Sequence, residues 1–536
     1  MEFYKINPQY KDRLMLVEDN GNRVTYSDFE AFYERIERQL TGGRLMFLFC
    51  ENTIGSVFFY LACLNRRIVP LLLDKNTDRA LLTGLIETYQ PEYLAMPQTL
   101  AGDILGNGGA GDGRPERSGS VGNGCPEKSE GAGNGCPERC EGEGDGYPEG
   151  RDTESGERHG DGNIEIRCQA YNRKPVISEY EYGVFERTQL SPLHLHEDLA
   201  LLLTTSGSTG SPKLVRQSRN NISSNAEAIA AYLELDASER PITSLPMNYT
   251  YGLSIINSHL LAGAAILLTQ STLFEKGFWE FFVREGATSI SGVPYTYEML
   301  KRLSFFDMEL PSLRTMTQAG GKLAPRLHKE FAGYAAETGR KFIVMYGQTE
   351  ATARMGYLPA KDAVAKCGSM GIAIPGGHFR LMEDETTEIT TPDTVGELVY
   401  AGPNVTMGYA VSRMDLEKGD ERGGILFTGD MAKRDADGYY YITGRKKRFL
   451  KLFGKRVNMD EIEQLIKAQY EGLSTACTGE DDRMRIYVAG QDKTFCDEAE
   501  TWLARKTGIH PRAIQVIPIE RIPTNEAGKT IYQDLP

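Results

Sequence analysis

Hydrophobic side chains recur at helical spacing near the start of the chain. Between residues 27 and 40 they fall on one face of a helix, and Ser27 and Glu30 match a capping-box pattern at its start. The positions on that face are Phe29, Phe32, Tyr33, Ile36 and Leu40. The segment therefore predicts an amphipathic helix that follows a short strand at residues 23–26.

Short apolar runs then alternate with helical patterns. Strands are expected at residues 44–50 and 68–73, with helices at 56–67 and 78–90. The alternation resumes with expected strands at 198–204, 264–269, 288–293, 314–320 and 341–347. Strands that alternate with helices predict parallel sheets, so the fold class is α/β.

The pattern changes again toward the C-terminus. After about Val395 it becomes rich in strands, and the last 90 or so residues mix helices and strands. We therefore expect a large N-terminal domain over residues 1–445, made of parallel α/β subdomains and a small β-rich subdomain. A small mobile α+β C-terminal domain should follow over 446–536.

A glycine-rich insertion interrupts the large domain at residues 101–163. It contains an 11-residue repeat whose copies begin at Gly111, Gly122, Gly133 and Gly144. Two glycines and a proline in each copy oppose a helix by about 1 and about 3 kcal/mol per residue, respectively. Disorder is therefore predicted. Metal binding is disfavoured, because the repeat itself would copy its cysteines and their spacing matches no tight pair.

Composition limits the classes of function. The 536 residues imply three or four structural units, and the net charge of −14 opposes nonspecific binding to nucleic acid or anionic membranes. No apolar run approaches the length of a membrane span, and the first residues do not resemble a secretory signal. Nine scattered cysteines, an odd number, favour a reduced cytoplasmic protein.

Residues 204–213, TTSGSTGSPK, follow an apolar strand and have the chemistry of a triphosphate loop. Backbone N–H groups, hydroxyls and an ammonium can all donate to phosphate oxygens. Lys213 follows a proline, so the loop does not match the Walker pattern, and a flexible surface loop is the structural alternative. The candidate phosphate ligands are Thr205, Ser206, Gly207, Ser208, Thr209, Gly210 and Lys213.

A second candidate segment lies at the end of the strand expected at residues 341–347. An open α/β sheet binds ligands at the carboxyl ends of its strands. The ring of Tyr346 could stack on a base there, the Thr349 hydroxyl could reach phosphate, and Glu350 could bind Mg²⁺. A purely structural role for the Tyr346–Gly347 pair is the alternative.

Three further charged residues complete the candidate site. Asp430 could accept hydrogen bonds from both ribose hydroxyls, and Arg445 is a charged donor near the expected domain boundary. Lys529 follows Gly528 on a turn-rich segment near the C-terminus. Each of them alone could be a solvated surface charge.

In their order and separation, these segments resemble the adenylate-forming superfamily of acyl-CoA synthetases, nonribosomal-peptide adenylation domains and firefly luciferases. The resemblance implies that ATP and Mg²⁺ bind here, with Tyr346 on adenine, Asp430 on ribose and residues 204–213 on the phosphates. Glu350 and Thr209 would hold the metal. The implied nucleotide-binding set also includes Gly320, Gly321, Gly347, Gln348 and Arg445.

The implied reaction activates a carboxylic acid as an acyl-adenylate and releases pyrophosphate. Attack of a carboxylate on the α-phosphate brings two anions together, so fixed cations and N–H dipoles must offset their repulsion. Lys529, Thr349 and Glu350 are the expected catalytic residues. No protein nucleophile is needed, so the histidines, including a helical His259, should be bystanders.

Members of the superfamily rotate the small domain between two half-reactions. The hinge is expected just after Gly444 and Arg445, where Lys447 and Arg448 stand in place of the aspartate that many members carry. The second half-reaction transfers the acyl group to a thiol. Seven residues follow Lys529, so the thiol, from coenzyme A or a free-standing acyl carrier protein, is expected in trans.

The acid pocket is expected around Tyr249, Thr250, Tyr251 and Gly252, although core packing would explain the tyrosines equally well. Thr250 stands where amino-acid-activating members carry an aspartate, which disfavours an α-amino acid because its ammonium would be unpaired. Two alternatives remain: a nucleotide-binding regulatory protein on an inactive synthetase fold, and an acid–amine ligase without a thiol intermediate.

Overall fold

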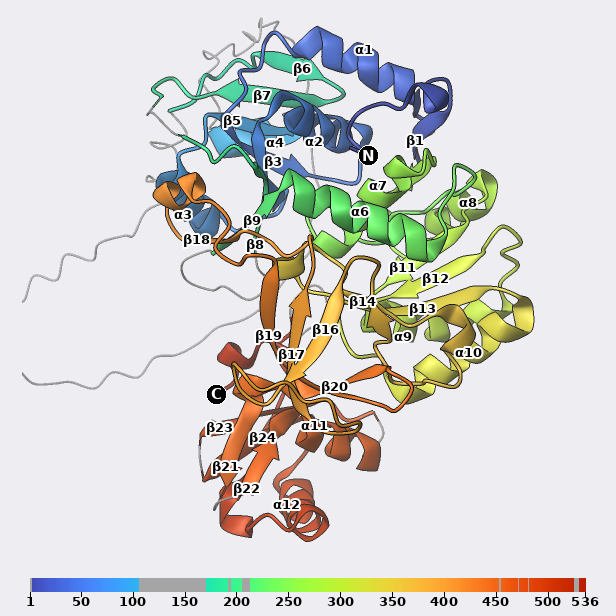
Figure 1. Ribbon diagram of the computed structural model, residues 1–536, viewed down its shortest axis with the longest axis vertical. Coiled ribbons are helices and arrows are strands. Elements are labelled where there is room, and N and C mark those ends of the chain that lie inside the picture. Colours follow the sequence, from blue (N-terminus) through green and yellow to red (C-terminus); the bar gives the residue numbers. More distant parts are fainter. Residues whose placement is uncertain are drawn as a thin grey trace, which may run out of the picture.

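The computed structural model describes residues 2–105, 170–190, 194–204, 213–452, 455–470, 472–480, 482–524 and 530–536. Figure 1 shows a large N-terminal region of sheets and helices, with a smaller C-terminal domain below it. The sheet of β16, β17, β19 and β20 lies between the two. This arrangement confirms the predicted α/β fold with a large and a small part.

An eight-stranded sheet forms the N-terminal part of the large region. Its central strands β8, β4, β3 and β5 are parallel, whereas the strands on both edges pair in antiparallel fashion. In spatial order the strands are β18 (Gly408–Ala410), β9 (Leu214–Ser218), β8 (Leu199–Thr204), β4 (Val69–Asp74), β3 (Leu45–Cys50), β5 (Tyr93–Pro97), β7 (Tyr182–Glu186) and β6 (Ile177–Glu179).

The prediction of parallel sheets is thus right for the centre and wrong for the edges. A tight connection explains one of these edge pairs, because two strands joined by a short turn must run antiparallel. Between β6 and β7 that turn is formed by Tyr180 and Glu181, whose φ angles of 48° and 63° suit a two-residue hairpin.

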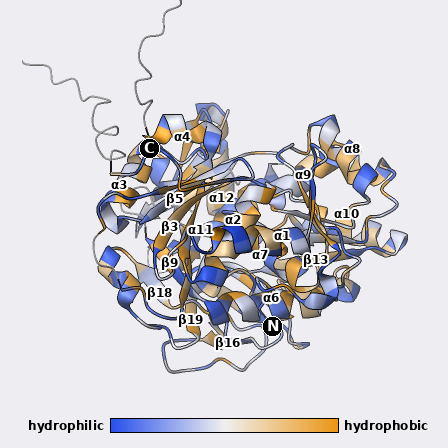
Figure 2. Cartoon of the chain, turned by 90° about the horizontal axis from the view of Figure 1, so that it is seen from above, coloured by the Kyte–Doolittle hydropathy of each residue, from blue (hydrophilic) through white to orange (hydrophobic). Residues whose placement is uncertain are grey.

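Helices cover both faces of this sheet. They are α1 (Tyr26–Ile36), α2 (Ile54–Arg66), α3 (Arg79–Tyr89) and α4 (Gln98–Leu105). Met46, Leu48 and Cys50 of β3 pack with α1 and α2, and Leu45 and Phe47 point to the other face. Figure 2 shows hydrophobic residues along β3 and β5, and mixed hydropathy along the peripheral helices α8 and α10.

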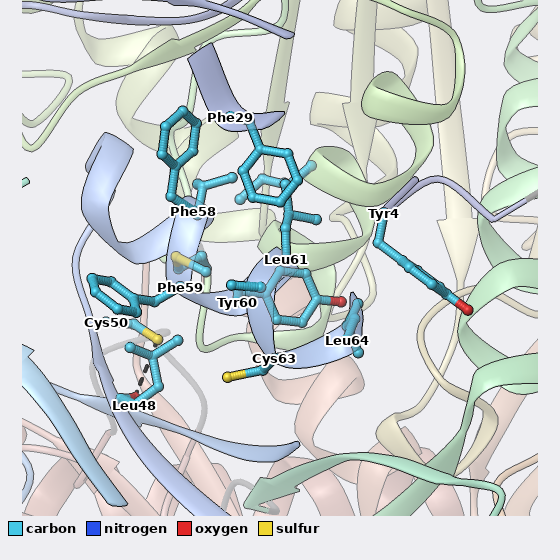
Figure 3. Packing of buried hydrophobic residues seen from close by; sticks show 14 of the residues in the cluster. Tyr4, Phe29, Leu48, Cys50, Phe58, Phe59, Tyr60, Leu61, Cys63 and Leu64 are labelled. Atoms are coloured by element: carbon cyan, nitrogen blue, oxygen red, sulfur yellow. Dashed lines mark hydrogen bonds between the residues drawn. The ribbon is translucent and has the colours of Figure 1, made fainter. Parts of the chain in front are cut away.

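Helix α2 is buried on almost every side. Figure 3 shows Phe58, Phe59, Tyr60 and Leu61 of α2 packed close to Phe29 of α1. The rings of Phe29 and Phe58 meet edge to face with centroids 5.2 Å apart, a favoured geometry for aromatic pairs. The apolar run that predicted this helix therefore forms the centre of the first core.

The capping box of α1 lies two residues earlier than predicted. Thr25 Oγ1 accepts from the Asp28 backbone N–H at 3.2 Å, and Asp28 Oδ2 accepts from the Thr25 N–H at 2.7 Å. Ser27 already lies within the helix. The short side chain of Asp28 serves as well as a glutamate because Thr25 ends the preceding strand β2 (Arg23–Thr25) in extended conformation.

A second sheet lies beside the first, in the order β11 (Ser289–Gly292), β12 (Thr315–Gln318), β13 (Lys341–Tyr346), β14 (Gly356–Tyr357) and β15 (Ile372–Ala373). Its first three strands are parallel, as predicted. The associated helices are α8 (Lys276–Glu285), α9 (Pro294–Arg302) and α10 (Pro325–Thr338).

Helices α6 (Arg219–Leu233) and α7 (Thr250–Leu261) lie between the two sheets (Figure 1). Ile222 and Leu253 pack toward the eight-stranded sheet, whereas Ile229 and Ile255 pack toward the five-stranded sheet. Two packed faces explain why nearly every residue of α7 is buried.

Two smaller sheets complete the large region. One contains β10 (Ile266–Leu268), β1 (Leu14–Glu18) and β2. The other is antiparallel, in the order β16 (His378–Met382), β17 (Gly396–Ala401), β19 (Ile425–Arg434) and β20 (Tyr440–Arg445). The strand-rich region therefore begins before Val395, the predicted boundary, because β16 supplies the outer strand.

The C-terminal domain has its own core. Its strands are β21 (Phe449–Leu452), β22 (Lys455–Asn458), β23 (Thr475–Glu480), β24 (Arg483–Ala489) and β25 (Ile514–Ile519), and its helices are α11 (Met459–Gln469) and α12 (Lys493–Thr507). Leu452, Ile462, Ile486 and Leu503 are among its buried residues. The region mixes helices and strands, as predicted.

Short 3₁₀ turns connect several elements. They are η1 (Pro8–Tyr10), η2 (Phe305–Asp307), η3 (Thr349–Ala351), η4 (Ala360–Asp362), η5 (Arg413–Glu417), η6 (Lys446–Arg448), η7 (Pro511–Ala513) and η8 (Tyr532–Asp534).

At the predicted hinge, Arg448 is anchored in the small domain. Its guanidinium donates to Asp460 and to Glu463 Oε1, the latter at 2.5 Å, and lies 3.9 Å from the Tyr532 ring centroid.

The predicted insertion begins later than residue 101. Helix α4 continues to Leu105, so residues 101–105 are helical, and the repeats from Gly111 onward lie outside the described residues.

Five cysteines of the described chain, Cys50, Cys63, Cys367, Cys477 and Cys496, are unpaired. None of the described helices combines the length and the apolar character needed to cross a bilayer.

His259 provides a test of the packing around α7. Its ring is buried, and Nδ1–H donates to the Ile255 carbonyl at 2.8 Å. Burial lowers its pKa to about 4, with a further contribution from the charge of Arg354. The imidazole must therefore stay neutral in the folded protein, whereas it becomes charged below about pH 6.5 when unfolded.

We expect this single group to lower the free energy of unfolding by about 2 kcal/mol between pH 7.5 and pH 5. His259→Asn should lose most of that pH dependence in urea titrations at the two pH values. The exposed His378→Asn serves as the control and should behave like the parent protein. An unchanged pH dependence in His259→Asn would contradict the assignment.

Candidate active site

Tyr346 and Asp430, 84 residues apart in the chain, meet at the end of β13. The Tyr346 hydroxyl donates to Asp430 Oδ2 at 2.5 Å, and Gln348 Nε2 donates to the same oxygen at 2.9 Å. Gln348 also donates to the Thr428 carbonyl at 3.1 Å, which ties it to β19. The five-stranded sheet and the antiparallel sheet are thus joined through one carboxylate.

The other oxygen of Asp430 faces Arg445. The two residues are directly opposite in the register of β19 and β20, and Arg445 Nε lies 3.3 Å from Oδ1. Arg445 is exposed while Asp430 is buried. Burial raises the pKa of Asp430, and the hydrogen bond from Tyr346 and the charge of Arg445 oppose that shift.

The same contact acts on Tyr346. Burial, followed by the charge of Asp430, raises the pKa of its hydroxyl well above the usual range, so the hydroxyl stays protonated and donates. A carboxylate has about four acceptor positions, and Tyr346 and Gln348 occupy only those on Oδ2. Oδ1 therefore remains able to accept ligand hydroxyls.

Two glycines permit close backbone contacts beside this cluster. A Cβ on Gly347 would lie 1.7 Å from the Ala353 carbonyl oxygen. Gly320, which follows β12, has a φ of +82°, and a Cβ there would lie 2.7 Å from the Tyr249 hydroxyl. Gly321 lies next to it, against Pro294. Gly320 and Gly347, two of the three predicted nucleotide-binding glycines that the structure describes, thus lie where the chain packs too tightly for a side chain.

Glu350 lies in a second polar cluster, centred on Tyr409 of β18. The Tyr409 hydroxyl donates to Glu350 Oε1 at 2.7 Å. Lys213 Nζ lies 4.6 Å from the centroid of the same ring, and the Arg422 guanidinium carbon lies 4.7 Å from it. Two cations and a carboxylate therefore meet around one aromatic ring, an arrangement suited to phosphate and a divalent cation.

The backbone of Glu350 is also held in place. Its carbonyl accepts from Arg422 Nη1 at 2.9 Å and from the Thr406 hydroxyl at 2.9 Å. Mg²⁺ in nucleotide sites is commonly bound by one or two carboxylates together with phosphate oxygens. Glu350, with one carboxylate oxygen outside the Tyr409 contact, fits that role.

Thr349 begins the turn η3 between the two clusters and is half-buried. The other predicted phosphate ligands, Thr205, Ser206, Gly207, Ser208, Thr209 and Gly210, lie outside the described residues, as does Lys529. Thr204, the residue before that loop, ends β8, and Lys213 after it is in the Tyr409 cluster. The chain on each side of the loop therefore lies at the site.

Of the four residues predicted for the acid pocket, Thr250 and Tyr249 contact other parts of the candidate site, whereas Tyr251 and Gly252 are tightly packed. Thr250 starts α7, and its hydroxyl donates to the Thr352 carbonyl beside Glu350. Tyr251 is a core residue, with 3% of its surface exposed and its hydroxyl donating to the Thr317 carbonyl at 2.9 Å. Gly252 packs against the Pro246 carbonyl, whereas Tyr249 reaches Gly320.

Sequence reasoning missed Tyr409 and Arg422. Neither belongs to a segment whose composition signals phosphate binding, and Tyr409 is 59 positions from Glu350. The only hint was the short turn-rich stretch around residues 419–424. Pairing of β18 with β9 brings Tyr409 opposite Val215, close to the start of β9 after the loop.

The fold and this site define a nucleotide-binding α/β protein of two domains. A family model described as "AMP-binding enzyme" matches residues 3–410. The chain therefore belongs to the AMP-binding enzyme family, and the resemblance to adenylate-forming enzymes is confirmed.

Among curated proteins, the chain is 31% identical over 279 residues to oxalate–CoA ligase of Arabidopsis thaliana, with 50% of this chain and 52% of that protein covered. It is 28% identical over 375 residues to long-chain-fatty-acid–CoA ligase of Salmonella typhimurium, with 67% and 64% covered. The chain thus spans about half the length of the first of these relatives and nearly two thirds of the second.

Solved structures match over nearly the full length. O-succinylbenzoate coenzyme A synthetase from Bacillus subtilis in complex with AMP has a TM-score of 0.71 at 18% identity, covering 100% of this chain and 98% of that chain. ATP-bound MatB from Rhodopseudomonas palustris has a TM-score of 0.68 at 20% identity, covering 99% and 97%. At these identities the matches show the fold alone.

The Tyr409 cluster can be tested by a matched pair of variants. Tyr409→Phe removes the hydrogen bond to Glu350 but keeps the ring that faces Lys213 and Arg422, whereas Tyr409→Leu removes both. We expect magnesium-dependent ATP binding to weaken about tenfold in the first variant, because a partner that orients a metal ligand is lost.

Calorimetric titration of ATP with and without Mg²⁺ measures this effect. Tyr409→Leu should bind more weakly still and should also lose affinity without Mg²⁺. Parent-like, magnesium-dependent affinity in both variants would show that the cluster does not take part in nucleotide binding.

Proposed function

We propose that the protein uses ATP to activate a carboxylic acid as an acyl-adenylate, releasing pyrophosphate, and then transfers the acyl group to a thiol. The observation that supports this most is the meeting of Tyr346, Gln348 and Arg445 at the Asp430 carboxylate. Asp430 Oδ1, which faces Arg445 and retains an acceptor position, lies next to an aromatic residue at a strand end, and this suits a nucleoside.

In the proposed complex, Asp430 Oδ1 accepts from ribose hydroxyls, and the ring of Tyr346 stacks on adenine. Lys213 and residues 205–210 surround the phosphates. Thr349 donates to phosphate. Glu350 and Thr209 would hold Mg²⁺, which when bound would supply positive charge beside the phosphates. The cations around Tyr409 lower the repulsion between the two reacting anions.

Lys529 is proposed as the residue that bridges the acid's carboxylate and the α-phosphate. Its ammonium would be stabilising mainly in the transition state, where both groups share negative charge. The acid would lie near Tyr249 and Thr250, because Tyr249 reaches Gly320 and Thr250 contacts the segment of Glu350.

Coenzyme A is the proposed acceptor, supported by the names of the relatives, which are CoA ligases for acids as different as oxalate and long-chain fatty acids. An acyl carrier protein in trans is the alternative thiol. Product mass spectrometry with each acceptor, and with an amine, separates these outcomes from an acid–amine ligase.

The first half-reaction is tested by exchange of labelled pyrophosphate into ATP across short, branched, aromatic and hydroxylated acids. Exchange should depend on both acid and Mg²⁺, and Lys529→Ala should lower its rate by about 10²-fold or more, because one fixed charge is lost. Lys506→Ala, an exposed lysine of α12, is the matched control and should retain full activity.

ATP binding without exchange for any acid would instead support the regulatory alternative. Equal loss in both lysine variants would indicate an effect on folding, not on the chemistry.

The insertion is proposed to contribute nothing to this reaction. The described segments before and after the insertion lie side by side, since Gln98 Nε2 donates to Ser178 Oγ at 2.6 Å and β5 pairs with β7. Deletion of residues 106–162 should therefore leave exchange activity within about threefold. Complete loss of exchange, with an unchanged melting temperature, would show that the insertion belongs to the site.

A further inference from the structure

Glu463 of α11 is a buried carboxylate that contacts three separate parts of the small domain. Its Oε1 accepts from Arg448 Nη2 at 2.5 Å and from the Cys477 backbone N–H at 2.7 Å. Its Oε2 accepts from the Tyr532 hydroxyl at 3.2 Å. Burial raises the pKa of Glu463, and the charge of Arg448 opposes that shift. The predicted hinge, strand β23 and the C-terminal segment therefore meet at one side chain.

The ring of Tyr532 has a partner as well as its hydroxyl. The guanidinium carbon of Arg448 lies 3.9 Å from the ring centroid, which is a cation–π contact. Arg448 is itself fixed, because it donates to the Cys477 carbonyl at 3.0 Å and to Asp460. A tyrosine suits this place, since its ring faces a cation while its hydroxyl donates to a carboxylate. Two independent contacts thus connect the C-terminal segment to the predicted hinge.

Tyr532 lies three residues after Lys529, the lysine proposed to act in catalysis. Lys529 itself is outside the described residues, but the chain is described on both sides of its segment. There, Thr524 and Thr530 form an antiparallel bridge. Three residues of chain span at most about 11 Å, so contacts that fix Tyr532 restrict where Lys529 can lie.

The same group of contacts continues toward the proposed nucleotide site. Asp460, which accepts from the Arg448 side chain, also accepts from the Arg445 backbone N–H at 3.1 Å. The side chain of Arg445 faces Asp430, the proposed ribose ligand. Figure 1 shows the C-terminus at the end of the small domain that is nearer the large region. Contacts therefore run from the segment after Lys529 to the carboxylate that would bind the nucleotide.

From these observations we propose that Tyr532 is a positioning residue for Lys529, holding the segment that carries the lysine against Glu463 and Arg448. An ammonium that stabilises a transition state has to be placed accurately, because an error of about 1 Å can cost about 10²-fold in rate. This inference rests on the proposed function, since it explains how the lysine assigned there is held in place.

Two variants separate the contacts of Tyr532. Tyr532→Phe removes the hydrogen bond to Glu463 but keeps the ring on Arg448, whereas Tyr532→Leu removes both. In pyrophosphate exchange with the most active acid, kcat should fall about threefold in the first variant and about tenfold in the second. KM for ATP and for the acid should change by less than about twofold, because no contact with either is removed.

A double-mutant cycle with Lys529→Ala separates positioning from a structural role. Because Tyr532 acts through Lys529, Tyr532→Leu should change the residual exchange rate of Lys529→Ala by less than about twofold. Tyr470→Leu is the matched control, since Tyr470 is a half-buried tyrosine of the same domain whose ring meets Phe495 and Trp502. The control should lower the melting temperature and leave kcat within about twofold of the parent value.

Limited proteolysis tests the anchoring without any substrate. Trypsin cleaves after lysine, and it cleaves a loosened segment faster than an anchored one. Cleavage after Lys529, detected by mass spectrometry as loss of residues 530–536, should be about fivefold faster in Tyr532→Leu than in the parent protein. Tyr470→Leu should be cleaved there at the parental rate.

The outcomes distinguish this inference from the proposed function. Equal losses of exchange from Tyr532→Leu with and without Lys529 would show a purely structural tyrosine. Parental kcat in both Tyr532 variants would overturn the positioning role while leaving the proposed function intact. If no acid supports exchange by the parent protein, the proposed function fails, and the cleavage rates still decide whether Tyr532 anchors the segment.

Discussion

The hydrogen bond between Tyr346 and Asp430 is the contact on which the site depends. It joins the end of a parallel strand to a strand of a separate antiparallel sheet. The Asp430 carboxylate is buried, so loss of this hydrogen bond would be costly. Gln348 supports the same oxygen, and Arg445 faces the other one. The Asp430 carboxylate thus connects the five-stranded sheet to the antiparallel sheet, and it can still accept a hydrogen bond from a ligand.

Arg445, at the boundary with the small domain, is part of that arrangement. Arg445 ends β20, and its backbone N–H donates to Asp460 at the start of α11 at 3.1 Å. Arg448, three residues later, is fixed by Asp460 and Glu463. A change in the orientation of the small domain would therefore act on the residue that faces Asp430. This link gives a physical route by which the two domains could affect one nucleotide site.

The two fully buried arginines, Arg216 and Arg354, have different kinds of partners. Arg216 is compensated by Glu421 and by carbonyls, which suits a structural role between β9 and the chain that follows β18. Arg354 lies against rings and a thioether, where cation–π attraction offsets only part of its desolvation. The contrast shows why a buried arginine has to be assessed through its partners and not through its burial alone.

Much of the fold could be predicted from residues 1–100 and from the last 90 or so residues. The apolar runs of β3 and β4 and the helical spacing of α1, α11 and α12 depend on local burial, which periodicity reports directly. The cap of α1 was misplaced by two residues, because Thr25 and Asp28 satisfy the same chemistry as Ser27 and Glu30. The antiparallel edge strands were missed, because pairing direction depends on connections and not on the strand itself.

By itself, the sequence determined which side chains could bind a nucleotide, since Tyr346, Glu350, Asp430 and Arg445 carry suitable chemistry wherever the chain places them. It also determined the family, because several such segments occur in one order. Only the tertiary structure decided that Tyr346 donates to Asp430, that Tyr409 and Arg422 join Glu350, and that Arg354 is buried against Tyr251. These contacts join residues far apart in the chain, and no local pattern encodes the distance between two such side chains.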